Sequence, residues 1–193
     1  WAGGANNSAV IQDTIDYITI ATLGNATDFG NLTASGRGFL NAGTSNGSRG
    51  VFGGGSSTGN GLTKVNIIDY ITIATTGNAL DFGDMLETRR LLSGASDGSR
   101  GVFGGGGYMG GSNWGDGLEY VTISTRSNSI LFGELTHTTV NQVAATSNGP
   151  RGVWGGGYVT NVIAYITIAT TGDALDFGDL TIARSGSGAT SGD

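Results

Sequence analysis

The chain has 193 residues, which suits one domain of ordinary size and is short for two domains with a linker. It contains no cysteine, which excludes disulfides and thiolate metal sites, and its net charge of −6 disfavours nucleic acid as a partner. It holds no apolar run long enough for a transmembrane helix, so we expect no membrane span.

The first elements of the chain read as strands and turns. Trp1 to Gly4 have the pattern of the middle of a strand, so we expect the sequence to be part of a longer polypeptide. The strongest strand pattern follows at 15–20, where β-branched and aromatic residues point to both faces. A turn at 23–26 leads to a strand with Phe29, and a weaker strand is expected before the Ser-Asn-Gly turn at 45–47.

From residue 49 onward the same pattern returns. Arg-Gly-Val-Phe-Gly-Gly-Gly at 49–55 recurs at 100–106 and, with Trp in place of Phe, at 151–157. Every copy has a strand that carries a tyrosine, and a phenylalanine follows in the next strand, twelve residues after that tyrosine. The tyrosines are Tyr17, Tyr70, Tyr120 and Tyr165, and the phenylalanines are Phe29, Phe82, Phe132 and Phe177.

These repeats predict a single all-β domain over 1–193, with modules at approximately 1–50, 51–101, 102–152 and 153–193. Each module is expected to form four short antiparallel strands, because turn signals recur every eight to twelve residues and no helical period is present. A strand with two apolar faces must be covered from both sides, so the modules should stack on one another.

The module resembles the kelch repeat: a hydrophobic strand ends in glycines, a later strand carries Tyr, an aromatic residue follows, and a basic residue precedes the next copy. The resemblance covers essentially the whole chain, with Phe29 and its counterparts where kelch modules usually carry Trp. It implies a kelch-like β-propeller with four blades of four antiparallel strands, either a complete four-bladed ring or an arc of a larger propeller. The sequence begins in the middle of an expected strand, and this favours the arc over the complete ring.

The wording of the module is also similar to repeats in virion-associated proteins of tailed bacteriophages, above all in Asp-Tyr-Ile-Thr-Ile-Ala-Thr-Thr-Gly-Asn-Ala-Leu-Asp-Phe-Gly-Asp at 69–84. This similarity implies a non-enzymatic structural or binding module in a tail fibre, a tail tip or a capsid decoration. Its partners would be other virion subunits and its location the virion or the extracellular space. The sequence leaves open whether it works as a homo-oligomer or as part of a longer chain.

The residues that could carry chemistry are few. His137 is the sole histidine, and the glycines at 104–111 open no helix, so we predict no catalytic residues, no cofactor and no enzyme. Acids recur at fixed positions and could bind calcium if neighbouring modules brought them together. The favoured interpretation is structural pairing between repeated arginines and aspartates, without a metal. These residues are Arg49, Arg100 and Arg151 with Asp28, Asp81 and Asp176.

The variable loops carry aromatic residues that the repeat does not explain: Tyr108, Trp114 and Tyr158. Exposed rings on loops at one end of a propeller could stack on sugars, although packing over the glycine turns is favoured. The alternative function is therefore a carbohydrate-binding adhesin or lectin-type propeller that binds a host-surface glycan. A cellular kelch scaffold for protein partners is a distant third.

Overall fold

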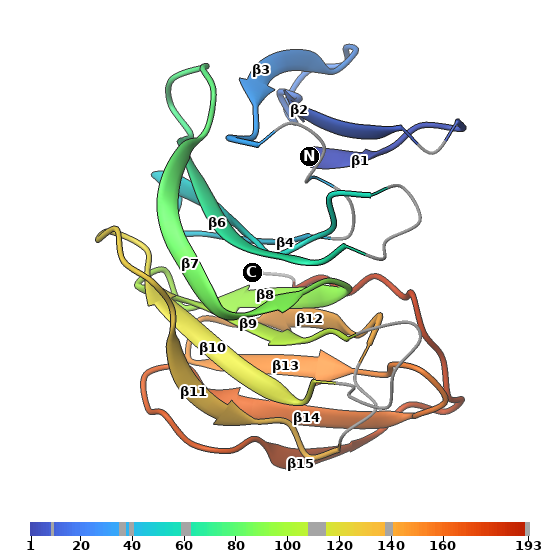
Figure 1. The fold of residues 1–193 in the computed structure, drawn as a ribbon. Helices are drawn as coiled ribbons and strands as arrows, with labels where there is room; N and C mark the ends of the chain where they lie inside the picture. The colour runs from blue at the N-terminus through green and yellow to red at the C-terminus, as the bar shows by residue number, and fades with distance from the viewer. Residues whose placement is uncertain are drawn as a thin grey trace.

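The computed structural model describes residues 1–8, 10–34, 38, 41–58, 63–107, 115–137 and 141–191. Its regular structure is antiparallel β throughout, and the described residues form no helix. The strands group into four sheets, which we number in chain order (Figure 1).

Each sheet is a meander of consecutive strands. Sheet 1 contains β1 (Ala2–Ala5), β2 (Ile11–Tyr17) and β3 (Thr27–Asn31). Sheet 2 contains β4 (Ala42–Ser45), β5 (Arg49–Gly53), β6 (Val65–Thr72) and β7 (Leu80–Arg89). Sheet 3 contains β8 (Leu92–Ser96), β9 (Arg100–Gly105), β10 (Gly117–Thr122) and β11 (Ile130–Glu134). Sheet 4 contains β12 (Ala144–Ser147), β13 (Arg151–Gly155), β14 (Val162–Thr167) and β15 (Leu175–Asp179).

The repeated motifs take the same place in every sheet. The Arg-Gly-Val strand pairs on both edges, so that Val51 lies opposite Thr44 on one side and Tyr70 on the other. The preceding hairpin turns on Gly47, whose φ of 80° favours glycine over residues with a Cβ. A β-bulge recurs just before the repeat tyrosine, for example between Ile68 and Asp69, and it re-aims the side chain at that position.

The sheets do not coincide with the predicted modules. The weak strand expected near 89–95 exists as β8, but it pairs with β9 and so begins sheet 3. Leu91, with a φ of 61°, turns the chain away from β7, whereas the turn around Gly98 folds β8 back onto β9 as a hairpin. Each full sheet therefore begins one strand before the Arg-Gly-Val motif, and sheet 1 has three strands where four were expected.

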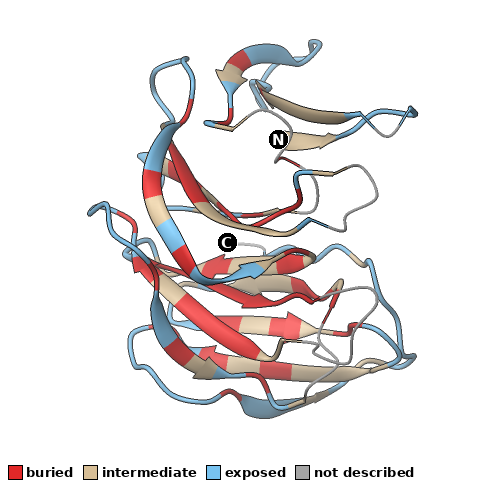
Figure 2. Ribbon diagram, viewed as in Figure 1, coloured by how far each residue is buried: buried red, intermediate tan, exposed pale blue. Residues whose placement is uncertain are grey.

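The sheets stack face to face in chain order, and β8 lies between β4 and β12. A cluster of buried apolar side chains fills each of the three spaces between consecutive sheets. Figure 2 shows buried residues throughout the middle sheets, whereas the outer strands β3 and β15 are mostly exposed. The stack is open: among the described residues, main-chain hydrogen bonds join sheet 1 to sheet 2, sheet 2 to sheet 3 and sheet 3 to sheet 4, and none joins sheet 4 to sheet 1.

The prediction of an all-β chain of repeated antiparallel sheets is confirmed. The physical reason is visible in sheet 3, which has one neighbour on each side. Val102 and Phe103 are adjacent on β9 and point to opposite faces, yet both are buried, at 0% and 1% exposure. Two apolar faces per strand therefore require stacking of sheets.

Candidate functional site

The repeated arginines, tyrosines and phenylalanines form one motif in each full sheet. Every repeat tyrosine packs edge to face on the phenylalanine twelve residues later, with ring centroids 5.8 to 5.9 Å apart. The guanidinium of Arg100 lies over the Tyr120 ring at 4.6 Å, and Arg49 and Arg151 take the same place over Tyr70 and Tyr165. The motif holds strands two, three and four of a sheet together.

The same arginines also reach the following sheet. Arg49 Nη1 donates to the carbonyl oxygens of Ile123 and Ser124, at 3.1 and 2.9 Å. Arg100 Nη1 donates to the carbonyl oxygens of Ile168 and Ala169, at 3.2 and 2.8 Å. In the described part of the chain the partners of these two guanidiniums are thus carbonyls and a tyrosine ring, and each arginine links two sheets.

The repeated aspartates of the Asp-Phe-Gly motif lie at the outer strands. Asp28 and Asp176 each accept a hydrogen bond from the N–H of the glycine two residues later, at 2.9 and 3.1 Å. Asp81 lies 3.8 Å from Arg126 Nη2, and both side chains are more than half exposed. Asp28 and Asp176 therefore bond within their own strands, and the exposed pair of Asp81 with Arg126 contributes little to stability.

A different acid, at the position just before the repeat tyrosine, is buried between sheets. Asp69 of sheet 2 is fully buried and accepts from the N–H and the hydroxyl of Thr33 in sheet 1, at 3.2 and 2.5 Å. The β-bulge before Asp69 turns its side chain toward the neighbouring sheet.

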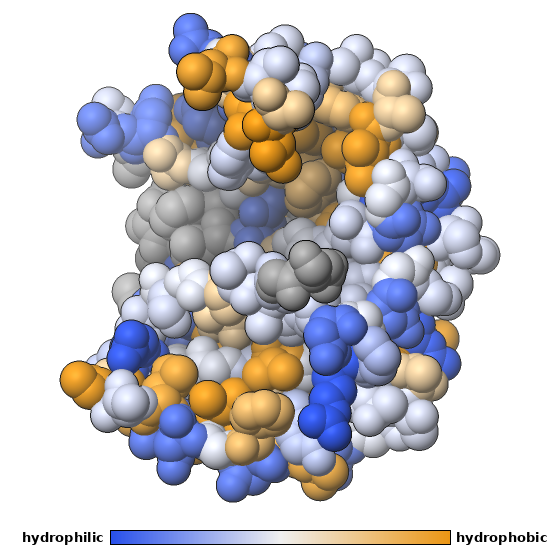
Figure 3. Space-filling view, turned by 180° about the vertical axis from the view of Figure 1, so that it is seen from behind, coloured by the Kyte–Doolittle hydropathy of each residue, from blue (hydrophilic) through white to orange (hydrophobic). Residues whose placement is uncertain are grey.

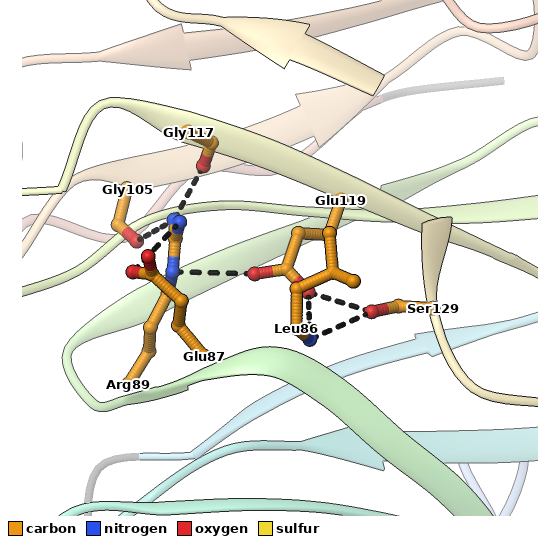
Figure 4. Close-up of polar contacts among 7 residues, drawn as sticks. All are labelled: Leu86, Glu87, Arg89, Gly105, Gly117, Glu119 and Ser129. Atoms are coloured by element: carbon orange, nitrogen blue, oxygen red, sulfur yellow. Dashed lines mark hydrogen bonds and ion pairs between the residues drawn. The ribbon is translucent and has the colours of Figure 1, made fainter. Parts of the chain in front are cut away.

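Glu119 is the counterpart of Asp69 in sheet 3, and it is 1% exposed. One carboxylate oxygen accepts from Leu86 N–H of sheet 2 at 2.8 Å and from the Ser129 hydroxyl at 2.6 Å, while the other lies 3.3 Å from Arg89 Nε (Figure 4). Arg89 in turn donates to the Gly117 carbonyl at 2.6 Å. This ion pair is buried at a junction between sheets, and its groups are occupied by structural contacts.

The first strands of sheets 2, 3 and 4, together with the segment after β15, surround a hollow. Two adjoining cavities of about 370 and 290 Å³ are lined by main chain and mostly small side chains. Their walls are equivalent segments of the four repeats, at 41–43, 91–94, 142–145 and 186–189. The hollow therefore lies where equivalent segments of successive sheets meet, and the last of its four walls follows β15.

The predicted sugar-binding aromatics are only partly described. Tyr108 and Trp114 lie outside the described residues. Tyr158 lies on the connection between β13 and β14 and is 51% exposed, next to Val159, which is 75% exposed. Two adjacent apolar side chains are exposed on this loop, so of the predicted sugar-binding positions within the described residues it is the one that could contact a ligand.

His137 is half-buried after β11. Burial lowers the pKa of its imidazole, against an opposing effect of the nearby Asp116 carboxylate. In the residues that the structure covers, no group of three acidic or histidine side chains is placed to hold a metal ion.

The inter-sheet role of Asp69 and Glu119 was missed at the level of sequence. The available signal was an acid directly before a repeat tyrosine, inside an apolar strand, at Asp69 and Glu119 but with Ala164 in the last copy. A charged residue in such a strand indicates a buried partner. No family model and no curated protein matches the chain.

Proposed function

We propose that the chain is a β-propeller module that acts without catalysis, as a structural or binding part of a tailed-bacteriophage virion. The propeller is supported by four-stranded meanders that stack face to face with their first strands around a common hollow. The placement in a virion, in a tail fibre, tail tip or capsid decoration, rests on the similarity of the repeat sequence to repeats in virion-associated proteins of tailed bacteriophages.

The observation that carries the proposal is the position of the variable loops. In each full sheet the connection between the second and third strand follows the glycine-rich run, and because the strand order is the same in these sheets, all three connections start from the same end of the second strand. They span 54–64, 106–116 and 156–161, so that two of them have eleven residues and the third has six, while the strands around them keep their register. Loops of varied length on a rigid scaffold are typical of a binding face.

The use of the buried charged groups also supports a role without catalysis. Asp69 and Glu119 are almost completely buried, and their carboxylates bond to N–H and hydroxyl groups of neighbouring strands. A general acid or base must instead reach a substrate proton.

The proposal is tested in purified particles of a tailed phage that carries the gene. We expect peptides of this chain in the particle proteome, and an antibody against the chain should label the tail or the capsid surface by immunogold microscopy. Particles that lack the peptides and the label, while infected cells contain the protein, would contradict a virion role.

A carbohydrate-binding propeller is the second candidate, favoured by the exposed Tyr158 on one of these loops. The purified chain is tested on an array of bacterial surface polysaccharides, with Tyr158→Ala and Trp114→Ala as loop variants and Tyr17→Ala as an aromatic control away from the loops. Binding that is lost in a loop variant and kept in the control supports this function. Absence of binding across the array removes it.

A further inference from the structure

The three junctions between sheets share one set of contacts. A turn of the later sheet lies on the last strand of the earlier sheet, where Gly77 N–H donates to the Phe29 carbonyl at 2.7 Å and Ala79 N–H to the Asn31 carbonyl at 2.8 Å. The Asn78 side chain accepts from Asn31 N–H at 3.0 Å. Asn128 and Asp173 cap the N–H groups of Asp84 and Glu134 in the next two junctions, at 3.0 and 3.1 Å.

The two open ends of the stack carry the separate halves of such a junction. The turn of sheet 1 has Gly24, Asn25 and Ala26, the same three residue types as the turn at 77–79. The outer strand of sheet 4 has Phe177-Gly178-Asp179-Leu180-Thr181 where sheet 1 has Phe29-Gly30-Asn31-Leu32-Thr33.

The buried acid has a matching pair as well. Asp16 precedes Tyr17 as Asp69 precedes Tyr70, and Thr181 lies four residues after Phe177 as Thr33 lies four residues after Phe29. Asp69 bonds to both polar groups of Thr33. The two open ends therefore carry the same residue types as the first junction, both at the turn and at the pair of buried acid and threonine.

Arg151 supplies the third element. Arg49 and Arg100 each donate to the carbonyls of the residues three and four places after the next repeat tyrosine. Arg151 has the same place over Tyr165. The carbonyls at the corresponding positions of sheet 1 belong to Ile20 and Ala21.

In the described part of the chain, sheet 1 also lacks the strand that the other sheets have first. That strand reads Ala-Gly-Thr-Ser at 42–45 and Ala-Ala-Thr-Ser at 144–147, and Gly-Ala-Thr-Ser stands at 188–191. Gly186, two residues before this segment, has a φ of 65° and donates to the Gln142 carbonyl, just as Gln142, with a φ of 54° and two residues before β12, donates to the Leu91 carbonyl. The chain after β15 thus follows the path that leads into β8 and β12.

The hollow shows which sheet this segment can complete. Residues 187–189 line the same cavity as 41–43, at the start of β4, and 143–145, at the start of β12. A first strand adjacent to both β4 and β12 closes a circle of four, because β8 already lies between those two strands. The segment therefore stands where the missing strand of sheet 1 of the same chain belongs.

We propose that the chain closes on itself through a fourth junction, in which 188–191 pairs with the free edge of β1 and the turn at 24–26 lies on β15. In this junction Asp16 accepts from Thr181, Asn25 caps Asp179 N–H, and Arg151 donates to the carbonyls of Ile20 and Ala21. The partner of both open faces is the chain itself. The proposal rests on the repeat geometry and is independent of the virion role.

The surfaces that would meet are apolar and uncovered. Ile20 of sheet 1 is 93% exposed, although its counterparts Ile123 and Ile168 are buried, and Phe177 of sheet 4 is 55% exposed, although its three counterparts are buried. Figure 3 shows apolar side chains in groups above and below a hollow on this side of the molecule. Closure removes this apolar surface from water, which is the main driving force for the contact.

The test uses cysteine pairs, since the chain has no cysteine of its own. Asn25→Cys with Asp179→Cys spans the proposed junction, and Asn31→Cys with Asn78→Cys spans the equivalent internal junction as a matched control. All four side chains are exposed, so the substitutions leave the cores intact. Each purified variant is oxidised at low protein concentration and analysed by non-reducing electrophoresis and by mass spectrometry of the linked peptides.

We expect both pairs to form a disulfide within one chain and to the same extent. Covalent dimers and longer ladders from the 25/179 pair, with the internal pair linked within one chain, would show that a second copy covers the open faces and would overturn the proposal. An unlinked 25/179 pair beside a linked 31/78 pair would overturn it too. Absence of the chain from virions changes neither reading.

Discussion

Phe132 and Phe177 hold the same position in sheets 3 and 4 but differ in their surroundings. Phe132 is 3% exposed, and its carbonyl accepts from Gly172 N–H of the next sheet at 2.8 Å. Phe177 makes the same edge-to-face contact with its own tyrosine, but it is 55% exposed. The contact inside the sheet is therefore equal, and the turn of a following sheet makes the difference.

This comparison shows that one sheet cannot bury its own last strand and needs the next sheet to cover it. Its own residues build the strands and the Arg-Tyr-Phe motif, whereas burial of the outer strand comes from the neighbour. Stability should therefore be lost mainly through substitutions at the junctions, and the following variants compare junction positions with matched positions outside them.

The largest effect is expected for Phe132→Ala. Removing a buried phenylalanine costs about 3–5 kcal/mol, because transfer energy is lost and a cavity remains. Closure predicts a similar loss for Phe177→Ala, as measured by urea unfolding of both variants. A loss below about 1 kcal/mol for Phe177→Ala alone would show that this face stays in water.

Glu119→Gln tests the buried ion pair of the second junction. The amide keeps the shape but removes the buried carboxylate that pairs with Arg89, and breaking a buried pair costs about 3–5 kcal/mol. Glu87→Gln is the control, since Glu87 lies 3.7 Å from the same arginine but is 74% exposed, and its loss should cost no more than about 1 kcal/mol. Equal melting temperatures for the two variants would refute the difference.

Gly83→Ala tests the approach of the turn to the outer strand. A Cβ at Gly83 would lie 2.5 Å from the Ser127 carbonyl oxygen, and φ is 150°, so the turn must move away and we expect a loss above about 2 kcal/mol. Gly98 has a φ of 85° and open space around it, so Gly98→Ala measures the backbone strain alone, at about 1–2 kcal/mol. Thermal unfolding that ranks Gly98→Ala as the more damaging change would contradict this account.

The smallest effect is expected for Arg100→Ala, which removes two hydrogen bonds to sheet 4 and the contact with Tyr120. The loss should be about 1–2 kcal/mol, because the carbonyls at this edge regain water. Arg126→Ala, at an exposed arginine 3.8 Å from Asp81, serves as the control and should leave unfolding nearly unchanged. An unaltered midpoint for Arg100→Ala would show that these contacts do not hold the sheets together.

Much of the fold was predictable because its signals are local. Turn residues such as those at 45–47 and the alternation at 15–17 depend only on neighbours in the chain. The strand expected at 15–20 was misplaced, since β2 runs over Ile11–Tyr17 and residues 18–20 lie outside it. The grouping of strands into sheets was less accessible, since β8 can be assigned to the strand before it or after it until the turn at Leu91 is known. The partners of Arg49 and Arg100 could not be predicted from the sequence, because the carbonyls that these arginines bind are far away along the chain.

The residues alone determined that this protein is all-β, that its unit recurs four times, and that its strands need cover on both faces. Tertiary structure decided where each sheet begins, which acids are buried between sheets, and that the segment after β15 joins the walls of the central hollow. The physical reason is that strand formation follows from turns and alternation along the chain, whereas burial and ion pairing depend on which sheet lies opposite.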